Sequence, residues 1–148
     1  MNVEKDFREF IALLNRHDVR YLIIGGFAYS FYAEPRYTKD IDILIDISPE
    51  NAERLMKALK DFGFADTALS QKDFLEPGQV IQLGVAPVRI DILTSIKGID
   101  FMNLWENRAA GRYGDIGVHF ISKNDLIRIK RVSGRNQDIA DIEKLEKI

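Results

Sequence analysis

The stretch that decides the fold is Lys39-Asp40-Ile41-Asp42-Ile43-Leu44-Ile45, which follows Ile24-Gly25-Gly26 earlier in the chain. Isoleucines alternate with acids here, and a period of two is typical of a strand that buries one face. The three isoleucines therefore share one face, and Asp40 and Asp42 share the other. Two carboxylates this close repel, so a fold tolerates them at a wet strand end or where a cation lies between them.

A second strand repeats this arrangement in Val88-Arg89-Ile90-Asp91-Ile92-Leu93. If the two strands are neighbours, Asp91 joins Asp40 and Asp42, and three oxygen donors suit a hard cation such as Mg²⁺. Carboxylates around a pair of metal ions are what phosphoryl or nucleotidyl transfer requires. An Asp-x-Asp pair alone is a weak signal, because most such pairs are simply solvated. We nevertheless predict Asp40, Asp42 and Asp91 as the catalytic and metal-binding residues.

The diglycine Gly25-Gly26 makes this prediction more specific. It follows an apolar run at 21–24, expected as a strand, and opens an aromatic segment at 27–32, expected as a short helix. Glycines let the backbone approach a phosphate, and a helix N-terminus offers free N–H groups. The pair would also suit a plain tight turn, and it matches neither the dinucleotide fingerprint nor the Walker A loop. Its combination with a basic turn and an Asp-x-Asp strand is rarer than any one part.

The remaining pattern predicts an α+β protein, with residues 1–148 as a single domain. Apolar periodicity and capping residues predict helices at 3–17, 49–63, 101–108, 123–134 and 137–147, and strands at 21–24, 41–45, 80–85, 88–93 and 116–121. The segment 65–78 is open between a loop and a short helix. This order favours a mixed sheet flanked by helices, with short helices at the C-terminus.

Composition excludes several classes of protein. The chain has 148 residues, no cysteine and a net charge of -2, so we expect neither disulfides, nor thiolate metal sites, nor broad affinity for nucleic acid. No apolar run approaches the roughly 20 residues that cross a bilayer, and the first residues lack the layout of a signal peptide. We therefore expect a cytoplasmic protein without membrane contact. A local basic patch lies at 123–135.

Three segments together resemble a known family. Ile24-Gly25-Gly26-Phe27-Ala28, Arg36-Tyr37-Thr38-Lys39-Asp40-Ile41-Asp42-Ile43 and Arg89-Ile90-Asp91-Ile92 are similar to the motifs of the DNA polymerase beta nucleotidyltransferase superfamily. The similarity is to its small prokaryotic members, related to abortive-infection and toxin–antitoxin nucleotidyltransferases. The segment 129–141 resembles their lysine-bearing helix followed by Arg-x-x-Asp-x-x-Asp.

The resemblance implies a minimal nucleotidyltransferase fold and a role for each matching residue. Asp40 and Asp42 would bind two Mg²⁺ or Mn²⁺ ions, and Asp91 would bind one ion and assist deprotonation of the acceptor. The implied nucleotide-binding residues are Gly25, Gly26, Arg36, Thr38 and Lys130, with the two basic side chains neutralising phosphate charge and Thr38 orienting the turn. For Arg135 with Asp138, an ion pair between helices is an equal alternative.

The expected function is transfer of a nucleoside monophosphate from an NTP, with ATP as the expected donor, to a hydroxyl of RNA, protein or a small molecule. The basic patch favours a phosphate-rich acceptor such as tRNA. Little chain remains for an acceptor-binding domain, so a partner protein or a homo-oligomer would supply it. The alternative is a catalytically silent nucleotide- or partner-binding module of a toxin–antitoxin-like pair. A sugar-nucleotide glycosyltransferase is disfavoured, because such enzymes usually need a longer chain.

Overall fold

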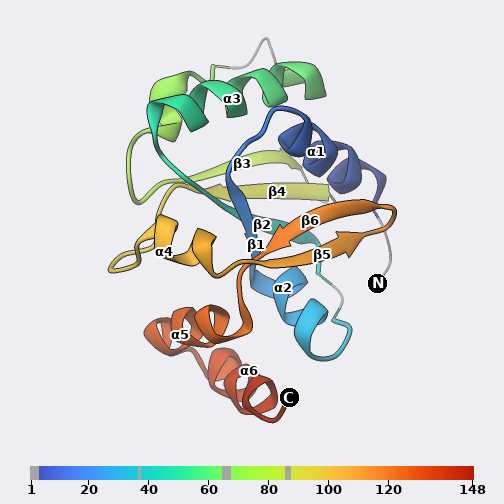
Figure 1. The fold of residues 1–148 in the computed structure, drawn as a ribbon, viewed down its shortest axis with the longest axis vertical. Helices are drawn as coiled ribbons and strands as arrows, with labels where there is room; N and C mark the ends of the chain where they lie inside the picture. The colour runs from blue at the N-terminus through green and yellow to red at the C-terminus, as the bar shows by residue number, and fades with distance from the viewer. Residues whose placement is uncertain (1–3, 37, 65–67, 86–87) are drawn as a thin grey trace.

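The computed structural model describes residues 4–36, 38–64, 68–85 and 88–148. Within them, six strands form one mixed sheet in the order β3-β4-β2-β1-β6-β5 (Figure 1). Their bounds are β1 Tyr21–Ile24, β2 Asp40–Ile45, β3 Val80–Val85, β4 Val88–Leu93, β5 Ala109–Tyr113 and β6 Ile116–Phe120. Strand β2 runs parallel to β4 and antiparallel to β1, which itself runs parallel to β6. The prediction of an α+β fold with a mixed sheet is confirmed.

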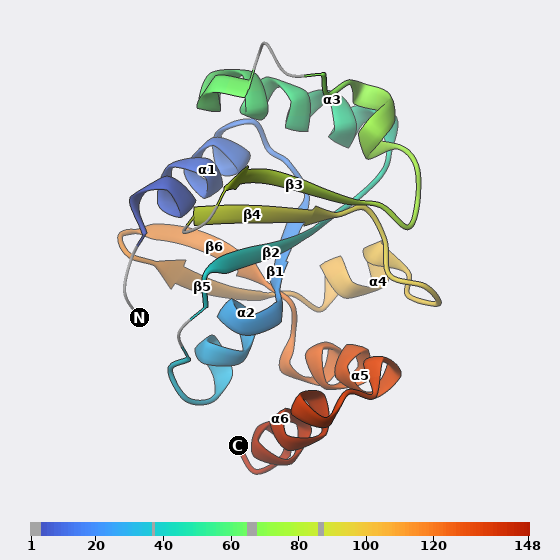
Figure 2. The same ribbon diagram turned by 180° about the vertical axis from the view of Figure 1, so that it is seen from behind.

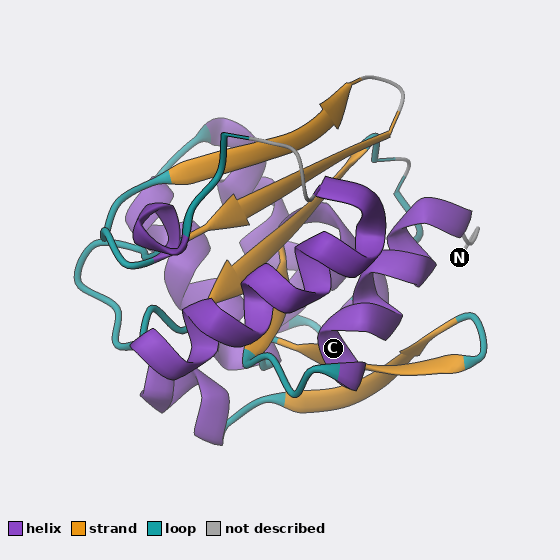
Figure 3. Ribbon diagram, turned by 90° about the horizontal axis from the view of Figure 1, so that it is seen from above, coloured by secondary structure: helices purple, strands orange, loops and turns teal. Residues whose placement is uncertain are grey.

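Helices cover the sheet from two sides. They are α1 Lys5–Arg16, α2 Gly25–Tyr32, α3 Pro49–Leu59, α4 Phe101–Glu106, α5 Lys123–Ser133 and α6 Asn136–Glu146, with a π-helical turn at Lys60–Phe64 and a 3-10 turn at Gln71–Phe74. Figures 1 and 2 show α1 and α3 on one side of the sheet, and α2, α5 and α6 on the other. Seen from above in Figure 3, helices lie across the central strands. The predicted C-terminal helices thus form a hairpin beside α2.

Local signals explain where several helices begin and end. The Ser48 hydroxyl accepts a hydrogen bond from the Asn51 N–H and starts α3, and Ser122 does the same for the Asp125 N–H at α5. These caps satisfy backbone donors that a helix leaves free in its first turn. Gly134 ends α5 in the left-handed conformation, with φ of 67°, which costs a glycine little.

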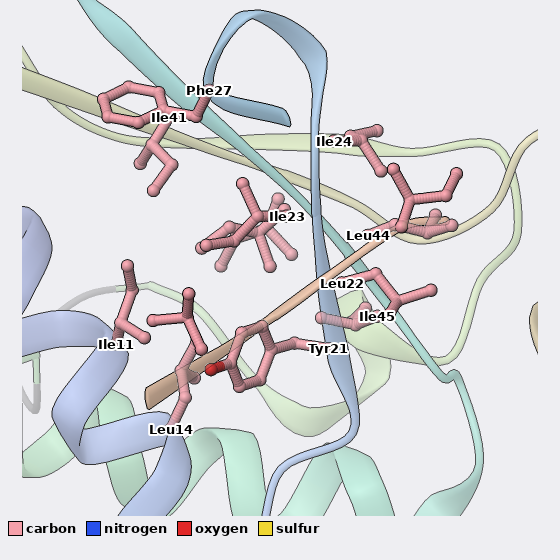
Figure 4. Packing of buried hydrophobic residues seen from close by; sticks show 14 of the residues in the cluster. Ile11, Leu14, Tyr21, Leu22, Ile23, Ile24, Phe27, Ile41, Leu44 and Ile45 are labelled. Atoms are coloured by element: carbon pink, nitrogen blue, oxygen red, sulfur yellow. The ribbon is translucent and has the colours of Figure 1, made fainter. Parts of the chain in front are cut away.

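The core centres on β1, all four of whose side chains are buried. Figure 4 shows Ile11 and Leu14 of α1 packed toward Tyr21 and Ile23 of this strand. A strand that is apolar on both faces must be covered by helices on both sides of the sheet. The end of β1, from which the diglycine emerges, is therefore fixed by the best-packed part of the molecule.

The sequence analysis did not predict strand β5. Strand β5 pairs antiparallel with β6 through a Gly114-Asp115 turn, but its sequence AAGRY lacks apolar alternation. Gly111 lies there because an added Cβ would come 2.6 Å from the ring of Phe120 and 2.8 Å from that of Phe31. The Gly-Asp dipeptide before the next strand was the available signal for a hairpin.

Smaller boundary differences also appear. Helix α2 begins at Gly25 rather than at 27, and α3 ends at Leu59, before the π-helical turn that contains Gly63. The open segment at 65–78 contains a 3-10 turn, and the expected turn at 86–87 lies outside the described residues, as do 65–67. Among the residues described, no helix has the length and apolar character to cross a membrane.

Candidate active site

The sheet brings the predicted acids together. Strands β2 and β4 are parallel neighbours, and their register places Asp42 opposite Asp91 and Asp40 opposite Arg89. The antiparallel register of β1 and β2 places Ile24 opposite Asp42. Because Gly25 follows Ile24 directly, the diglycine lies beside the same carboxylates. The three acids and the diglycine thus occupy one end of three adjacent strands.

Arg89 joins two of the acids. Its guanidinium donates to Asp40 Oδ2 at 2.7 Å and to Asp91 at 3.0 and 3.2 Å. Sequence reasoning assigned Arg89 no role, although the strand period already places it on the same face as Asp91. The guanidinium neutralises part of the charge that three neighbouring carboxylates would otherwise accumulate.

The pKa of Asp42 is raised in this crowded acidic site. Its partial burial, together with the negative charges of Asp91 and Asp40, raises the pKa of Asp42 to about 6. The positive charges of Arg89 and Arg135 act in the opposite direction. A carboxyl held this way gains from a nearby cation, which would favour its ionised form.

The backbone of Gly25 packs directly on that carboxyl. A Cβ added at Gly25 would come 2.3 Å from Asp42 Oδ2, and the residue has φ of +68°, a conformation that glycine adopts readily. Gly26 packs against Thr38, whose hydroxyl donates to the Asp40 carbonyl at 2.9 Å. Thr38 therefore braces the backbone that leads into β2; that it contributes to nucleotide binding stays a prediction.

The structure places the two predicted phosphate-binding cations in ion pairs. Arg36 forms a bidentate pair with Asp141 at 3.0 and 2.5 Å, and its guanidinium lies 3.9 Å from the centre of the Tyr29 ring. The amino group of Lys130 is buried between Asp141 at 3.0 Å and Asp138 at 3.4 Å. That either side chain neutralises nucleotide phosphate stays a prediction.

A divalent cation fits the chemistry of the three acids. Among the described residues, no three carboxylate or imidazole groups form a ready-made ligand cage, and Arg89 holds two of the acids. However, Mg²⁺ commonly takes only one or two protein carboxylates and completes its shell with substrate phosphates and water. The oxygen donors, their excess negative charge and the raised pKa of Asp42 therefore suit a cation that arrives with a nucleotide.

The six-stranded mixed sheet with its flanking helices matches solved nucleotidyltransferase structures, so this is a nucleotidyltransferase fold. The sequence agrees over nearly its whole length: residues 2–147 match the family described as "Nucleotidyltransferase of unknown function (DUF6036)". The chain belongs to this family. No curated protein shows significant sequence similarity to it.

Solved structures with low sequence identity share the fold. The lincosamide antibiotic adenylyltransferase LnuA, with lincomycin bound, is 19% identical with a TM-score of 0.60, covering 99% of this chain and 98% of its own. An antigenic nucleotidyltransferase-like protein from Paracoccidioides brasiliensis is 16% identical with a TM-score of 0.56, covering 95% and 74%. ANT(2")-Ia, in complex with adenylyl-2"-tobramycin, is 13% identical with a TM-score of 0.54, covering 94% and 84%.

Proposed function

We propose that this protein transfers a nucleoside monophosphate from an NTP to a hydroxyl group, with Asp40, Asp42 and Asp91 as its catalytic residues. The observation that carries the proposal is the register of β2 and β4, which sets Asp42 opposite Asp91 beside the backbone of Gly25. Family membership and the fold shared with two adenylyltransferases support the same activity and favour ATP as the donor.

Different residues of the chain would bind the metal ions and the phosphates. Asp40 and Asp42 would hold Mg²⁺ or Mn²⁺, and the backbone at Gly25 and Gly26 would approach the phosphates. Two bound divalent ions would supply charge neutralisation at the triphosphate. Arg36 and Lys130 would neutralise phosphate charge by turning from their ion pairs with Asp141 and Asp138 of α6.

The reaction is an in-line displacement at the α-phosphorus. The acceptor oxygen forms a bond to this phosphorus, and the bond to the bridging oxygen breaks, so that pyrophosphate leaves with the bonding electrons. Asp91 is buried, with 7% of its surface exposed, and lies next to Asp42. It would receive the proton of the acceptor hydroxyl, because its strand sets it opposite Asp42, on the face of the sheet where the acids gather.

A small hydroxylated molecule is the acceptor class to test first. The solved structures of similar fold contain lincomycin and an adenylylated tobramycin, and the net charge of -2 gives no general attraction to RNA. RNA such as tRNA, and protein side chains, remain the other acceptor classes of the proposal.

The alternative is a silent nucleotide- or partner-binding module. The contacts of Arg89 with Asp40 and Asp91 favour it, because an arginine held in this way competes with a cation for the same oxygens. In a silent module these ion pairs would persist when the nucleotide binds.

The test is incubation with Mg²⁺ and each radiolabelled NTP against a panel of aminoglycosides, lincosamides, total tRNA and proteins. Transfer of label that is lost in Asp42→Ala supports the enzyme. Tight NTP binding without transfer to any acceptor supports the silent module. Calorimetry that detects no binding of any NTP in the presence of Mg²⁺ would refute both the transferase and a nucleotide-binding module.

A further inference from the structure

A hollow of about 420 Å³ lies between the end of α1, the strands β5 and β6, and α4. We call it the α1–β6 hollow, and its lining includes Asn15, Asp18, Val19, Trp105, Gly117 and His119. Its volume falls in the range of small-molecule sites, about 300–1,000 Å³. The chain enters β1 just after Val19 and leaves it at the diglycine, and a strand of four residues spans about 13 Å. The hollow is therefore separate from the acids of the candidate active site.

Asp18 is a residue that its local structure disfavours. It follows the last turn of α1 with φ of 54°, the only positive φ of a non-glycine residue in the described part of the chain. Glycine or asparagine is usual at this position, and an acid there also meets the negative end of the helix dipole. Within the described residues only its backbone forms hydrogen bonds, so its carboxylate has no partner. The fold thus tolerates an unpaired acid at the rim of the hollow although it gains nothing from it.

Gly117 leaves the floor of the hollow open. It lies inside β6, its φ is not positive, and a Cβ added to it would meet nothing within 4 Å. Neither the backbone conformation nor close packing therefore requires a glycine here. A glycine weakens the interior of a strand, and it often marks a place where a ligand approaches the backbone closely. Gly117 is thus the second residue of the hollow that the fold alone does not explain.

His119 supplies a hydrogen-bonding group at the wall of the hollow. Its ring packs against those of Tyr21 and Trp105, with centroids 5.3 and 5.0 Å away. Neither ring nitrogen has a hydrogen-bonding partner among the residues that the structure describes. Burial, together with the positive charge of Arg108, lowers the pKa of His119. The imidazole is therefore neutral at pH 7, and one of its nitrogens can accept a hydrogen bond.

Asn15 fixes the shape of the hollow. Its amide nitrogen donates to the Gly117 carbonyl at 2.8 Å, and its amide oxygen accepts from the Tyr21 hydroxyl at 2.8 Å. These two bonds tie the end of α1 to both β6 and β1. A site that is already in shape loses less entropy when a ligand binds.

We propose that the α1–β6 hollow binds a small molecule that carries a protonated amine on an apolar ring. Asp18 would accept the charged N–H groups, and Trp105 and Val19 would contact the ring. Among the described residues that line the hollow, Asp18 is the only one charged at pH 7, so the site favours a cation and repels an anion. This binding goes beyond the proposed transfer and does not depend on it.

The experiment is an NMR titration of the ¹⁵N-labelled full chain with three probes that share one ring system. Tryptamine is cationic, tryptophol is neutral and indole-3-acetate is anionic. We expect tryptamine to bind with a Kd on the order of 1 mM, as suits a ligand of its size, and to shift the amide signals of Gly117 and His119. Tryptophol should bind about tenfold more weakly, because it lacks the charge-assisted hydrogen bond, and indole-3-acetate should not bind.

Three variants locate the binding. Asp18→Asn keeps a residue that tolerates the left-handed conformation; it should weaken tryptamine about tenfold and leave tryptophol unchanged. Gly117→Val fills the floor, suits a strand and should abolish binding of both. Glu9→Gln is the matched control, because it removes the same charge from an exposed position of α1, and its affinities should equal those of the wild type. Thermal unfolding of each variant checks that the fold is retained.

Four outcomes would overturn the proposal. They are a wild type that does not bind tryptamine, equal affinity for the three probes, unchanged tryptamine affinity in Asp18→Asn, and signal shifts that cluster at Asp42 instead of at the hollow. A wild type that is dimeric in sedimentation without any probe, and monomeric as Asp18→Asn, would assign the hollow to a partner chain and also refute the proposal. None of these measurements uses an NTP, so their failure would leave the proposed function untouched.

Discussion

Replacing Gly25 by alanine should disable the site while leaving the fold intact. The new Cβ would lie 2.3 Å from Asp42 Oδ2, whereas ordinary contact begins at 3.4 Å, so the carboxylate must move by about 1 Å. The positive φ adds a cost of about 1–2 kcal/mol for a residue with a side chain. Because a misplacement of about 1 Å can cost about 10²-fold in rate, we expect a modest loss of stability and a large loss of function.

Two further glycines separate these effects. Gly98 has φ of +78° with nothing within 4 Å of an added Cβ, and Gly117 has open space without a positive φ. Gly98→Ala should therefore lose about 1–2 kcal/mol of stability and no activity, and Gly117→Ala should lose neither. Urea unfolding measures the stability, and the rate of label transfer from the NTP, together with NTP affinity by calorimetry, measures the function.

The reasoning fails under two results. Gly25→Ala with wild-type NTP affinity and transfer rate would show that the carboxylate need not stay where the backbone of Gly25 holds it. An equal functional loss in Gly98→Ala would show that general destabilisation, rather than the contact with Asp42, is responsible.

Three other substitutions test the site and its support. The folded-state pKa of Asp42, about 6, exceeds its ordinary value of 3.8. The metal-free folded protein therefore binds more protons than the unfolded chain between these pH values, and its stability should fall as pH rises from about 4 to about 6. Asp42→Asn should remove this pH dependence and gain about 2 kcal/mol of stability at pH 7, as urea unfolding at several pH values would show. Asp141→Asn strips buried Lys130 of its closer acid and should cost about 3 kcal/mol, read as a lower midpoint of thermal unfolding. Gly111→Ala places a Cβ 2.6 Å from an aromatic ring and should cost about 2 kcal/mol in urea unfolding, and a cost no greater than that of Gly117→Ala would contradict it.

The elements that sequence predicts well are those with strong local periodicity. The alternation at 40–45 and at 88–93 shows which side chains share a face, and the helix caps at Ser48 and Ser122 mark where helices begin. These signals are local, because they depend on backbone geometry over a few residues. Strand β5 was missed because its residues are small or polar and its place in the sheet depends on pairing with β6.

Sequence by itself determined that one strand carries two acids on one face, that a second carries one acid, and that a diglycine follows a third strand. Only the tertiary structure decided that β2 and β4 are adjacent in parallel with Asp42 opposite Asp91, and that Arg89 bridges Asp40 and Asp91. It likewise decided that Lys130 is buried in ion pairs while Arg135 stays exposed. The physical reason is that strand order, register and burial arise from packing between segments far apart in the chain, which no local pattern of residues encodes.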